Sequence, residues 1–301
     1  EKSGKTGELS ISDVVFGIAP RINAAGRIEH GKIAVQILVE LDIDKARELA
    51  EVIENHNKER KELDQNITKE ALEMVDENKL STVVYSSYWH KGVVGIVASR
   101  LIESYYKPTI VLSEKDGELT GSARSVKGFD LYEALVKCEH LLEKFGGHKY
   151  AAGLTVKKEN LKAFISEFEK VVSATITKEQ LVAQIDVDMQ IELEEVNDQL
   201  YRIIKQFAPF GPQNRTPNFI SKNVTDCGWG KKVGEEKSHV RLVLNKSDDR
   251  ITAIGFRMAD DFELTNDKKE FDICYSIDEN TWNGKTSLQL RLKGIKKSKY
   301  L

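Results

Sequence analysis

The segment from residue 80 to residue 113 constrains the fold of this chain more than any other part of the sequence. STVVYS is typical of a buried strand, GVVGIVASRLIESYY has the apolar spacing of a helix, and TIVLS after Pro108 is a second buried run. A helix between two such strands indicates a right-handed crossover, because parallel strands need a long connection. The segment therefore predicts a parallel strand pair within an α/β domain, which we place at residues 80–174.

A polar stretch, GSARS at residues 121–125, follows the second strand and precedes a new helix. Asp130 stands three residues before Glu133, which is a capping-box spacing, so we expect the helix to begin there. Its unpaired N–H groups would point back at GSARS, which we predict to be a turn, and helix N-termini of this kind bind phosphate. The polar side chains of this turn are those of Ser122, Arg124 and Ser125. An ordinary polar turn is the alternative, and the stretch taken alone favours it.

Two loops of the same predicted sheet contain histidine next to glycine. YSSYWHKGVVG puts His90 just after the first strand, and Gly92 and Gly95 would let a helix N-terminus come close. FGGHKYAAG puts His148 after Gly146 and Gly147, which we expect to end a helix. A single histidine is more often structural than functional. Two of them beside a phosphate-type turn favour a shared crevice that binds a ligand.

A helical pattern runs from about Asp44 to Asn78, and we predict a long bridging helix over residues 44–79. Its ends carry apolar residues at spacings of three and four, whereas the middle, ENHNKERKE, has none. A helix with this pattern usually crosses a gap between domains. The polar middle faces either water or a ligand held in that gap, and base rates alone favour water.

Short alternating runs in the last third of the chain predict a β-barrel. HVRLVL, RITAIGF, FDICYSI and SLQLRLKGI are joined by turns that contain Asn, Gly or Asp. This pattern indicates a small antiparallel barrel, with the OB-fold as the leading candidate. AQIDVDMQIELEEV before them alternates strictly, so we expect a strand with its acids on the wet face rather than a metal site.

Global charge and cysteine content exclude several classes of protein. The 301 residues include 45 Lys and Arg against 48 Asp and Glu, so any nucleic-acid surface must be local. One basic stretch, residues 281–301, has six Lys or Arg and no acid. It could be such a local surface, and a solvated strand edge explains it equally well. The three cysteines lie far apart, which argues against a disulfide framework or a zinc site and fits a cytoplasmic protein. No run approaches the length of a membrane span, and the start at Glu1 suggests a piece of a longer chain.

Several of these motifs resemble a known family in both sequence and order. WHKGVVGIVASRL, GSARS and FGGHKYAAG are similar to the DHHA1 domain, and PRINAAGR resembles the motif that closes the catalytic domain of the RecJ family of single-strand-specific 5′ exonucleases. The long helix, the DHHA1 domain and an OB-fold entered through PFGPQNRTPNF follow in the family's order, over about residues 18–293. There are two departures: residues 213–215 are Gln-Asn-Arg where the family commonly has Gly-Asn-Pro, and the sequence contains no Asp-His-His metal motif.

The resemblance implies an α/β plus all-β architecture. Its parts are the end of the catalytic domain with PRINAAGR at residues 1–43, the bridging helix at 44–79, the DHHA1 domain at 80–174 and the OB-fold-like barrel at 175–301. It implies part of a monomeric, cytoplasmic, single-stranded-DNA-specific 5′→3′ exonuclease of DNA repair and recombination that uses Mn or Mg. The metal ligands would lie in the catalytic domain outside this chain, so we expect this chain alone to bind no metal and to hydrolyse no DNA.

The resemblance also assigns roles to particular residues. Ser122 and Arg124 would receive the 5′-phosphate, while Trp229 and Trp282 would stack on bases of the trailing strand. The other residues expected to line the substrate cleft are Arg21, Asn23, Arg27, Asn57, Arg60, His90, Gly92, Ser125, Gly146, Gly147 and His148. The expected partners are single-stranded DNA with a 5′-phosphate, a single-strand-binding protein and a helicase. The polar middle of the long helix would then face substrate rather than water.

Two alternative functions stay open. A DHH/DHHA1 phosphodiesterase of oligonucleotides or cyclic dinucleotides normally ends with the DHHA1 domain, so the barrel pattern after Asn218 argues against it. A non-catalytic nucleic-acid-binding module needs no motif of the catalytic domain, so PRINAAGR and the bridging helix argue against that function.

Overall fold

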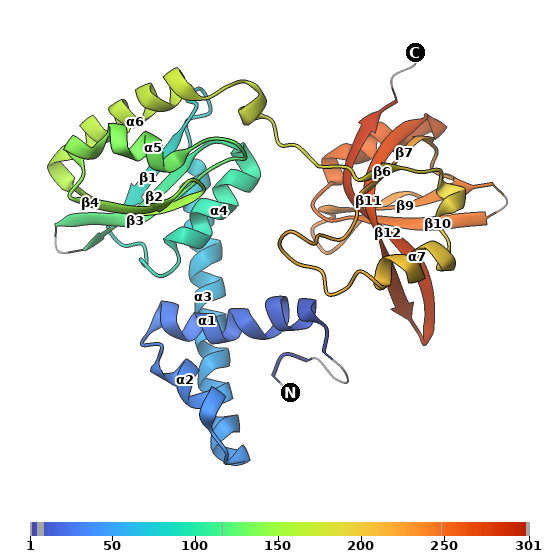
Figure 1. The fold of residues 1–301 in the computed structure, drawn as a ribbon, viewed down its shortest axis with the longest axis horizontal. Coiled ribbons are helices and arrows are strands. Elements are labelled where there is room, and N and C mark those ends of the chain that lie inside the picture. The colour runs from blue at the N-terminus through green and yellow to red at the C-terminus, as the bar shows by residue number, and fades with distance from the viewer. Residues whose placement is uncertain (1, 5–8, 116, 248, 299–301) are drawn as a thin grey trace. The chain divides into compact units, whose positions relative to one another are not determined.

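The structure is a computed structural model and describes residues 2–4, 9–115, 117–247 and 249–298 (Figure 1). The chain divides into two compact units, Glu1–Ala183 and Gln184–Leu301. The predicted α/β domain lies in the first unit and the predicted barrel in the second. In the part of the chain that is described, no helix is both long and apolar enough to cross a membrane.

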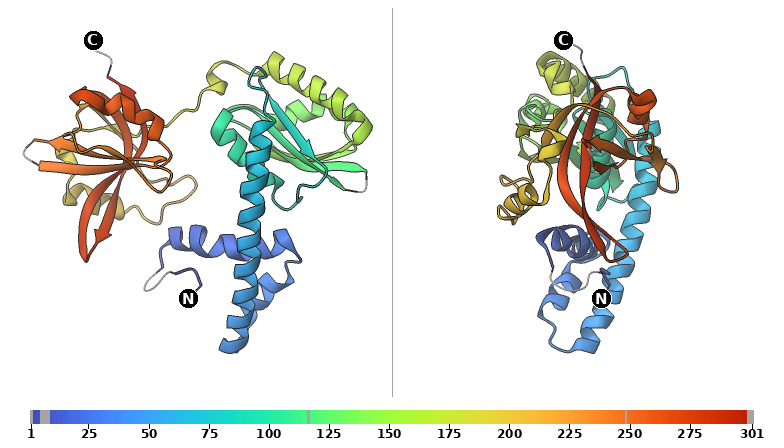
Figure 2. Two further views of the ribbon diagram at one scale, coloured as in Figure 1. Left: turned by 180° about the vertical axis from the view of Figure 1, so that it is seen from behind. Right: turned by 90° about the vertical axis from the view of Figure 1, so that its right-hand side faces the viewer.

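The first unit begins with helices that pack on one long helix. These elements are the π-helical turn Asp13–Ile18, α1 (Ala19–Ile28), α2 (Lys32–Val39) and α3 (Ile43–Glu73). The Asp42 carboxylate caps α3 by accepting hydrogen bonds from the next backbone N–H groups. α1, α2 and α4 (Val94–Tyr105) all pack against α3, as Figure 2 shows. The predicted long helix is therefore present, and Asn57 and Asp64 in and near its polar middle are buried rather than in water.

A mixed five-stranded sheet forms the rest of the first unit. Its strands are β1 (Thr82–Ser86), β2 (Thr109–Lys115), β3 (Glu118–Arg124), β4 (Lys144–His148) and β5 (Ala151–Lys157), in the order β1-β2-β3-β5-β4. β1 and β2 are parallel and are joined by α4, which confirms the predicted crossover. The other pairs are antiparallel. Single 3₁₀ turns lie at Glu139–Leu141, Lys158–Asn160 and Glu179–Leu181.

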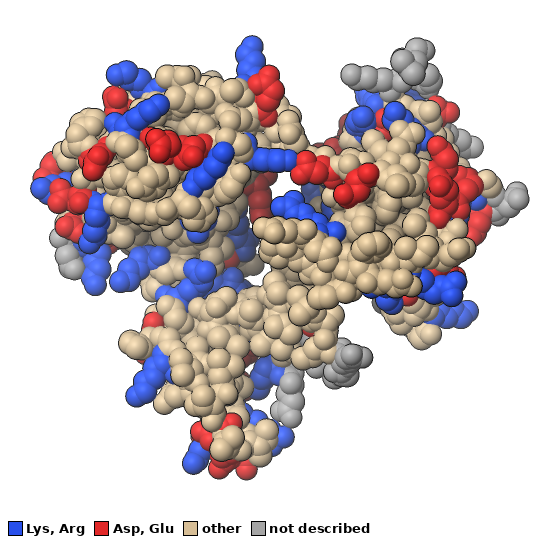
Figure 3. Space-filling model, in the orientation of Figure 1, with Lys and Arg blue, Asp and Glu red and all other residues tan. Residues whose placement is uncertain are grey.

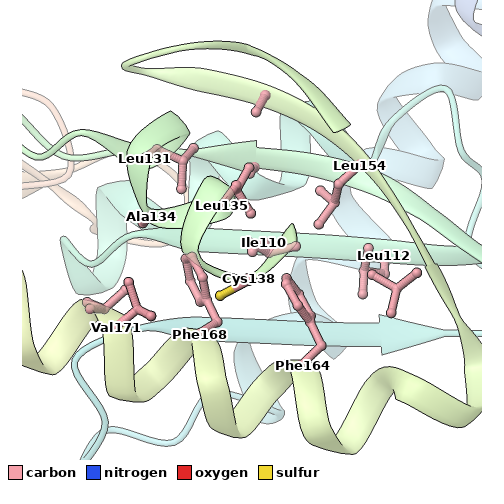
Figure 4. Close-up of a cluster of buried hydrophobic side chains, with 14 of the residues drawn as sticks. Ile110, Leu112, Leu131, Ala134, Leu135, Cys138, Leu154, Phe164, Phe168 and Val171 are labelled. Atoms are coloured by element: carbon pink, nitrogen blue, oxygen red, sulfur yellow. The ribbon is translucent and has the colours of Figure 1, made fainter. Parts of the chain in front are cut away.

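Helices cover both faces of this sheet. α5 (Leu131–Lys137) and α6 (Leu161–Thr175) lie on one face, where they build a core with Ile110, Leu112 and Leu154 of the strands (Figure 4). Phe164 and Phe168 of α6 stack in this core with ring centroids 5.9 Å apart. α4 and the end of α3 cover β1 and β2 on the opposite face through a second core. Truncation of one such buried side chain costs about 2 to 5 kcal/mol, so these two cores stabilise the sheet.

The GSARS stretch is part of a strand, so the predicted turn is wrong. Residues 121–124 form the second half of β3, in which Leu119 and Ala123 are buried in the core. Side chains of a strand alternate between two faces, so the polar residues between them point to the opposite face. Gly121 permits this packing, because a Cβ there would lie 2.1 Å from the carbonyl oxygen of Val111 on β2.

The two glycines of FGGHKYAAG do not end a helix, which is a second error of the sequence prediction. α5 already ends at Lys137, and Gly146 and Gly147 lie in β4, which forms a hairpin with β5. Gly147 has φ +154°, and a Cβ there would lie 2.3 Å from the carbonyl oxygen of Ala151. Close approach of the two hairpin strands therefore requires glycine at this position.

The second unit is a β-barrel with short helical segments. The elements are β6 (Met189–Gln190), α7 (Asp198–Lys205), β7 (Phe219–Val224), β8 (Lys231–Val233), β9 (His239–Lys246), β10 (Asp249–Gly255), β11 (Phe271–Trp282) and β12 (Lys285–Lys297), with 3₁₀ segments at Leu193–Glu195 and Ala259–Lys268. The hydrogen-bonded order is β6-β7-β11-β12-β10-β9-β8. An isolated bridge between Asp226 and Leu244 pairs the segment that follows β7 with β9. β10 and β12 are parallel. This closed arrangement is the predicted OB-fold.

The strand predicted from the run AQIDVDMQIELEEV is mostly irregular. Within it only Met189–Gln190 pairs with β7. The Asp188 carboxylate accepts a hydrogen bond from the backbone N–H of Asn218 at 2.8 Å. This acid is exposed, as predicted, and it also fixes the entry into β7.

Candidate nucleic-acid interface

Ser122 and Arg124 lie on the face of β3 that points away from the α5–α6 core. The first turn of α4 lies against them: a Cβ on Gly95 would be 3.0 Å from Nη2 of Arg124 and 3.1 Å from Oγ of Ser122. Because residue 95 has no side chain, the hydroxyl and the guanidinium lie beside the N-terminal end of a 12-residue helix. The first N–H groups of a helix lack intrahelical acceptors and favour anions.

The N-terminus of α5, which the sequence predicted to face these residues, has partners of its own. Asp130 caps the helix as predicted, because its carboxylate accepts from the N–H of Glu133 at 3.1 Å. The N–H of Leu131 donates to the carbonyl of Lys149 at 3.1 Å. Ser125 donates its hydroxyl to a backbone carbonyl four residues later, so it stabilises the connection to α5. The helix N-terminus that lies beside Ser122 and Arg124 is therefore that of α4 and not that of α5.

The sheet surface beside Ser122 and Arg124 has little side-chain cover. Residues that pair across strands share one face of a sheet. The register gives two rows on this face, Ser122–Gly153–Gly146 and Arg124–Ala151–His148. A Cβ on Gly146 would meet no atom within 4 Å, so a ligand can approach the backbone there.

The loop that carries His90 is held by its neighbour Trp89. The indole of the buried Trp89 donates a hydrogen bond through Nε1 to the carboxylate of Glu70 on α3 at 2.8 Å. The backbone carbonyl of Trp89 accepts a hydrogen bond from the hydroxyl of Ser113 at 2.5 Å. His90 Nδ1 accepts from the N–H of Gly92 at 3.1 Å. The imidazole therefore has a fixed position just before α4.

α1 closes the same region from the other side. Arg27 donates through Nη1 to the carbonyl of Gly92 at 3.1 Å, and a Cβ on Gly92 would lie 2.1 Å from the carbonyl oxygen of Arg27. Asn23, one turn earlier on α1, is exposed and lines a shallow hollow with Arg27 and Gly31. Arg21 is turned to α3 instead, where its Nε pairs with Glu54 at 2.6 Å.

Arg60 on α3 joins this region through a buried polar cluster. Its guanidinium donates to Oδ1 of Asn57 at 2.8 Å and lies 3.6 Å from the fully buried carboxylate of Asp64. Arg100 of α4 pairs with the same carboxylate at 2.5 Å. One carboxylate oxygen of Asp64 therefore pairs with two guanidinium groups. The other oxygen, Oδ1, has no hydrogen-bond partner in the structure.

The arginines of this region act on one another electrostatically. Burial lowers the pKa of Arg124, and the positive charge of Arg27 lowers it further. Burial also lowers the pKa of Arg60; the charge of Asp64 opposes this effect, while Arg100 and Arg27 add to it. Figure 3 shows Lys and Arg side chains gathered where the sheet of the first unit approaches α1 and α2. We name Arg27, Arg60, Arg100 and Arg124 the arginine cluster; Asp64 is its buried counter-charge.

The structure thus brings Arg27, Arg60, Arg124, Ser122, His90 and Gly92 into one region, with Asn57 beneath it and Gly146 and His148 along the adjoining sheet face. Sequence reasoning missed Asp64 and Arg100. It had expected Gly92 and Gly95 of the motif WHKGVVG to let a helix N-terminus come close, and Gly95 lies against Ser122 and Arg124. Nothing in the local sequence links Asp64 to Arg100, because they are 36 residues apart.

In the second unit, Trp229 is exposed and its ring faces Arg250. The side chain of Trp282 and the residue Lys299 lie outside the described part of the structure. Of the basic stretch near the C-terminus, Lys296 lies 3.6 Å from Asp272. Among the described residues, no group of three or more His, Cys, Asp or Glu side chains could hold a metal ion.

Comparisons with known proteins agree with this organisation. The DHHA1 domain family matches residues 76–174, and the RecJ OB domain family matches residues 187–294. The single-stranded-DNA-specific exonuclease RecJ of Bacillus subtilis is 35% identical over 295 residues, which are 96% of this chain and 37% of that protein. The protein of the same name from Haemophilus influenzae is 30% identical, over 94% of this chain and 51% of its own length.

A crystal structure of RecJ from Thermus thermophilus in complex with Mn²⁺ superimposes with a TM-score of 0.84 at 25% identity. The match covers 100% of this chain and 43% of that one, so the chain spans about half or less of these relatives. Both domain matches, the alignments along nearly the whole chain and the shared fold lead to one conclusion. The chain belongs to the RecJ family and carries its DHHA1 and OB domains.

Proposed function

We propose that this chain binds the 5′-phosphorylated end of single-stranded DNA as part of a single-stranded-DNA-specific 5′→3′ exonuclease of DNA repair and recombination. The observation that carries the proposal is the arginine cluster, in which Arg60 and Arg100 share the buried carboxylate of Asp64, while Arg124 lies beside the N-terminus of α4. Such an excess of positive charge is compensated well by a phosphate group. The names of the relatives give the substrate class, single-stranded DNA.

A terminal phosphate differs from an internal one in its charge. It carries about −1.5 to −2 at neutral pH, whereas an internal phosphodiester carries a single negative charge. The Ser122 hydroxyl, the forked guanidinium of Arg124 and the first N–H groups of α4 provide donors for this extra charge. Arg27 and Asn23 would bind the following phosphates, and the glycine-lined sheet face leaves room for the strand.

Hydrolysis by the intact enzyme would use a divalent metal, Mn or Mg, which activates water and polarises the phosphodiester. Solved RecJ structures from Thermus thermophilus are described in complex with Mn²⁺ and with Mg²⁺. No group of three or more His, Cys, Asp or Glu side chains within the described ranges could hold such an ion. The role that we propose for this chain is to bind and orient the strand. A single-strand-binding protein and a helicase stay predicted partners.

Anisotropy titration tests the phosphate site. A 3′-labelled single strand would be titrated with wild type and Arg124→Ala in two forms, 5′-phosphate and 5′-hydroxyl, at one fixed salt concentration. Loss of a charge-assisted contact worth about 1.5 to 3 kcal/mol would weaken the phosphorylated strand by roughly 10- to 150-fold and the hydroxyl form much less.

Arg47→Ala is the matched control, because Arg47 lies on the same unit and pairs at the surface with Asp44 at 3.3 Å. It should leave both affinities unchanged. Equal losses for the two strands in Arg124→Ala would refute the phosphate site, and a wild type that does not prefer the phosphorylated strand would refute end recognition by this chain.

A further inference from the structure

A further row of polar side chains continues the sheet face on which the proposed phosphate site lies. Thr120 of β3 pairs with Thr155 of β5, which in turn pairs with Lys144 of β4. Residues that pair across strands share one face of a sheet. Thr120 stands two residues before Ser122 on β3, so it points to the same face, about 7 Å along the strand. We name Thr120, Thr155 and Lys144 the threonine–lysine row.

The two threonine hydroxyls of this row are hydrogen-bonded to each other. The Oγ1 atoms of Thr120 and Thr155 are 3.3 Å apart. Thr155 is 1% exposed, whereas Thr120 is exposed. The buried hydroxyl therefore holds the exposed one in place. When the Thr155 hydroxyl donates to Thr120, the Thr120 hydroxyl keeps its own proton for an anion.

Lys144 provides a positive charge at the other end of the row. Its side chain is exposed, and among the residues that the structure describes no carboxylate forms an ion pair with it. The nearby Lys157 differs, because it pairs with Glu143 at 3.2 Å. Glu118, one row farther along β3, lies between Lys115 and Lys157 in the register. The surface around the row therefore keeps an excess of positive charge.

Glycines leave the surface between Ser122 and Lys144 open. Gly153 and Gly146 follow Ser122 across the sheet in the neighbouring row. A Cβ on Gly146 would meet no atom within 4 Å, and one on Gly153 would meet only the carbonyl oxygen of Gly121 at 3.9 Å. A group larger than a single phosphate can therefore lie on the backbone here.

The row lies on the side of the phosphate site that is away from α1. On this face of β3 the order along the strand is Arg124, Ser122, Thr120. Arg27 of α1 lies close enough to Arg124 for its charge to act on that guanidinium. In the proposed function the strand leaves toward α1, where Arg27 and Asn23 bind its following phosphates. The row therefore faces the outer side of the terminal phosphate, where the strand has no further nucleotide.

We propose that the threonine–lysine row is a second phosphate subsite, which binds the additional phosphates of a 5′-diphosphate or 5′-triphosphate end. The phosphate bonded to the strand stays at Ser122 and Arg124. The phosphates beyond it extend over the two glycines toward the Thr120 hydroxyl and the Lys144 ammonium, and lysine is a common phosphate ligand. The subsite rests on the proposed function, because it takes the 5′-phosphate site as its anchor.

Anisotropy titration of the whole chain with three forms of one 3′-labelled single strand tests the subsite. The forms carry a 5′-hydroxyl, a 5′-monophosphate or a 5′-triphosphate, at one fixed salt concentration. Wild type should bind the triphosphate strand roughly 10-fold more tightly than the monophosphate strand, the lower end for a charge-assisted contact, because Lys144 is exposed. Lys144→Ala should bind the triphosphate strand only as tightly as the monophosphate strand, with the other two affinities unchanged. Thr120→Val should weaken the triphosphate strand alone, by roughly 2- to 5-fold.

Lys137→Ala is the matched control, because Lys137 is exposed on α5, which covers the opposite face of the sheet. It should bind all three strands as wild type does. A wild type that prefers the monophosphate to the hydroxyl but does not distinguish the triphosphate from the monophosphate overturns the subsite and leaves the proposed function intact. A wild type that binds the hydroxyl and monophosphate strands equally refutes the proposed function together with the subsite. Equal losses for the monophosphate and triphosphate strands in Lys144→Ala, or the same loss in Lys137→Ala, would indicate a general charge effect and also overturn the subsite.

Discussion

Asp64→Asn tests whether one buried carboxylate holds the arginine cluster together. Asp64 is fully buried, and its carboxylate faces the guanidinium groups of Arg100 and Arg60 at 2.5 and 3.6 Å. The substitution keeps the shape of the side chain and removes its charge. The guanidinium groups of Arg60 on α3 and Arg100 on α4 would then lie close together with no negative charge between them. Their mutual repulsion would weaken the packing of α3 against α4.

The expected loss in the free energy of unfolding depends on how exposed the two partners of Asp64, Arg60 and Arg100, are. Breaking a buried ion pair on one side costs about 3 to 5 kcal/mol. The Arg60 side chain is 12% exposed and that of Arg100 is 32% exposed, so water compensates part of the loss and the lower end applies. We expect a loss of about 3 kcal/mol, which for a unit of this size lowers the melting temperature by roughly 6 to 12 °C.

Urea unfolding followed by the fluorescence of Trp89 measures this effect in the first unit alone. Trp89 is buried there, and Trp229 and Trp282 would be replaced by phenylalanine in all variants. Asp44→Asn is the control, since Asp44 is on the same helix but pairs with Arg47 at the surface, where an ion pair contributes at most about 1 kcal/mol. A loss in Asp64→Asn no larger than in Asp44→Asn would refute the reasoning.

Two further predictions concern glycine and cysteine. Gly92→Ala should lower the free energy of unfolding by roughly 1 to 3 kcal/mol, because the added Cβ would meet the Arg27 carbonyl, whereas Gly146→Ala should change it by less than about 0.5 kcal/mol in the same urea titration. Burial raises the pKa of the Cys138 thiol to about 11, so iodoacetamide at pH 8 should leave it unmodified in the folded protein, as mass spectrometry can show. Since the folded-state pKa lies above the ordinary pKa of the thiol, the stability that Cys138 contributes is complete below that ordinary pKa and is lost as the pH rises through about 11. Rapid alkylation of Cys138 at pH 8 would contradict both statements.

The elements that the sequence predicted well are those with a local signal. The strand–helix–strand segment ending at Ser113 has the apolar periodicity of its elements, and the barrel strands alternate as expected. The Asp130 cap depends on a contact only three residues away. Such features need no information from distant parts of the chain.

The errors lie where tertiary pairing overrides local preference. GSARS has the composition of a turn, but Leu119, Gly121 and Ala123 alternate with polar residues, and packing against β2 and the core makes it a strand. The alternation was visible in the sequence, whereas the partner that selects it was not. The same holds for Gly147, whose need for glycine follows from its hairpin partner.

By itself, the sequence determined the two fold classes and the long helix, because these depend on periodicity within short segments. The residues of the proposed phosphate site were named from motifs that resemble the RecJ family, and they stay a prediction. Only the tertiary structure decided that α4 rather than α5 presents its N-terminus to Ser122 and Arg124, and that Asp64 serves both Arg60 and Arg100. Charge balance in a site depends on distances in space, and residues far apart in the chain become neighbours only when helices and strands pack.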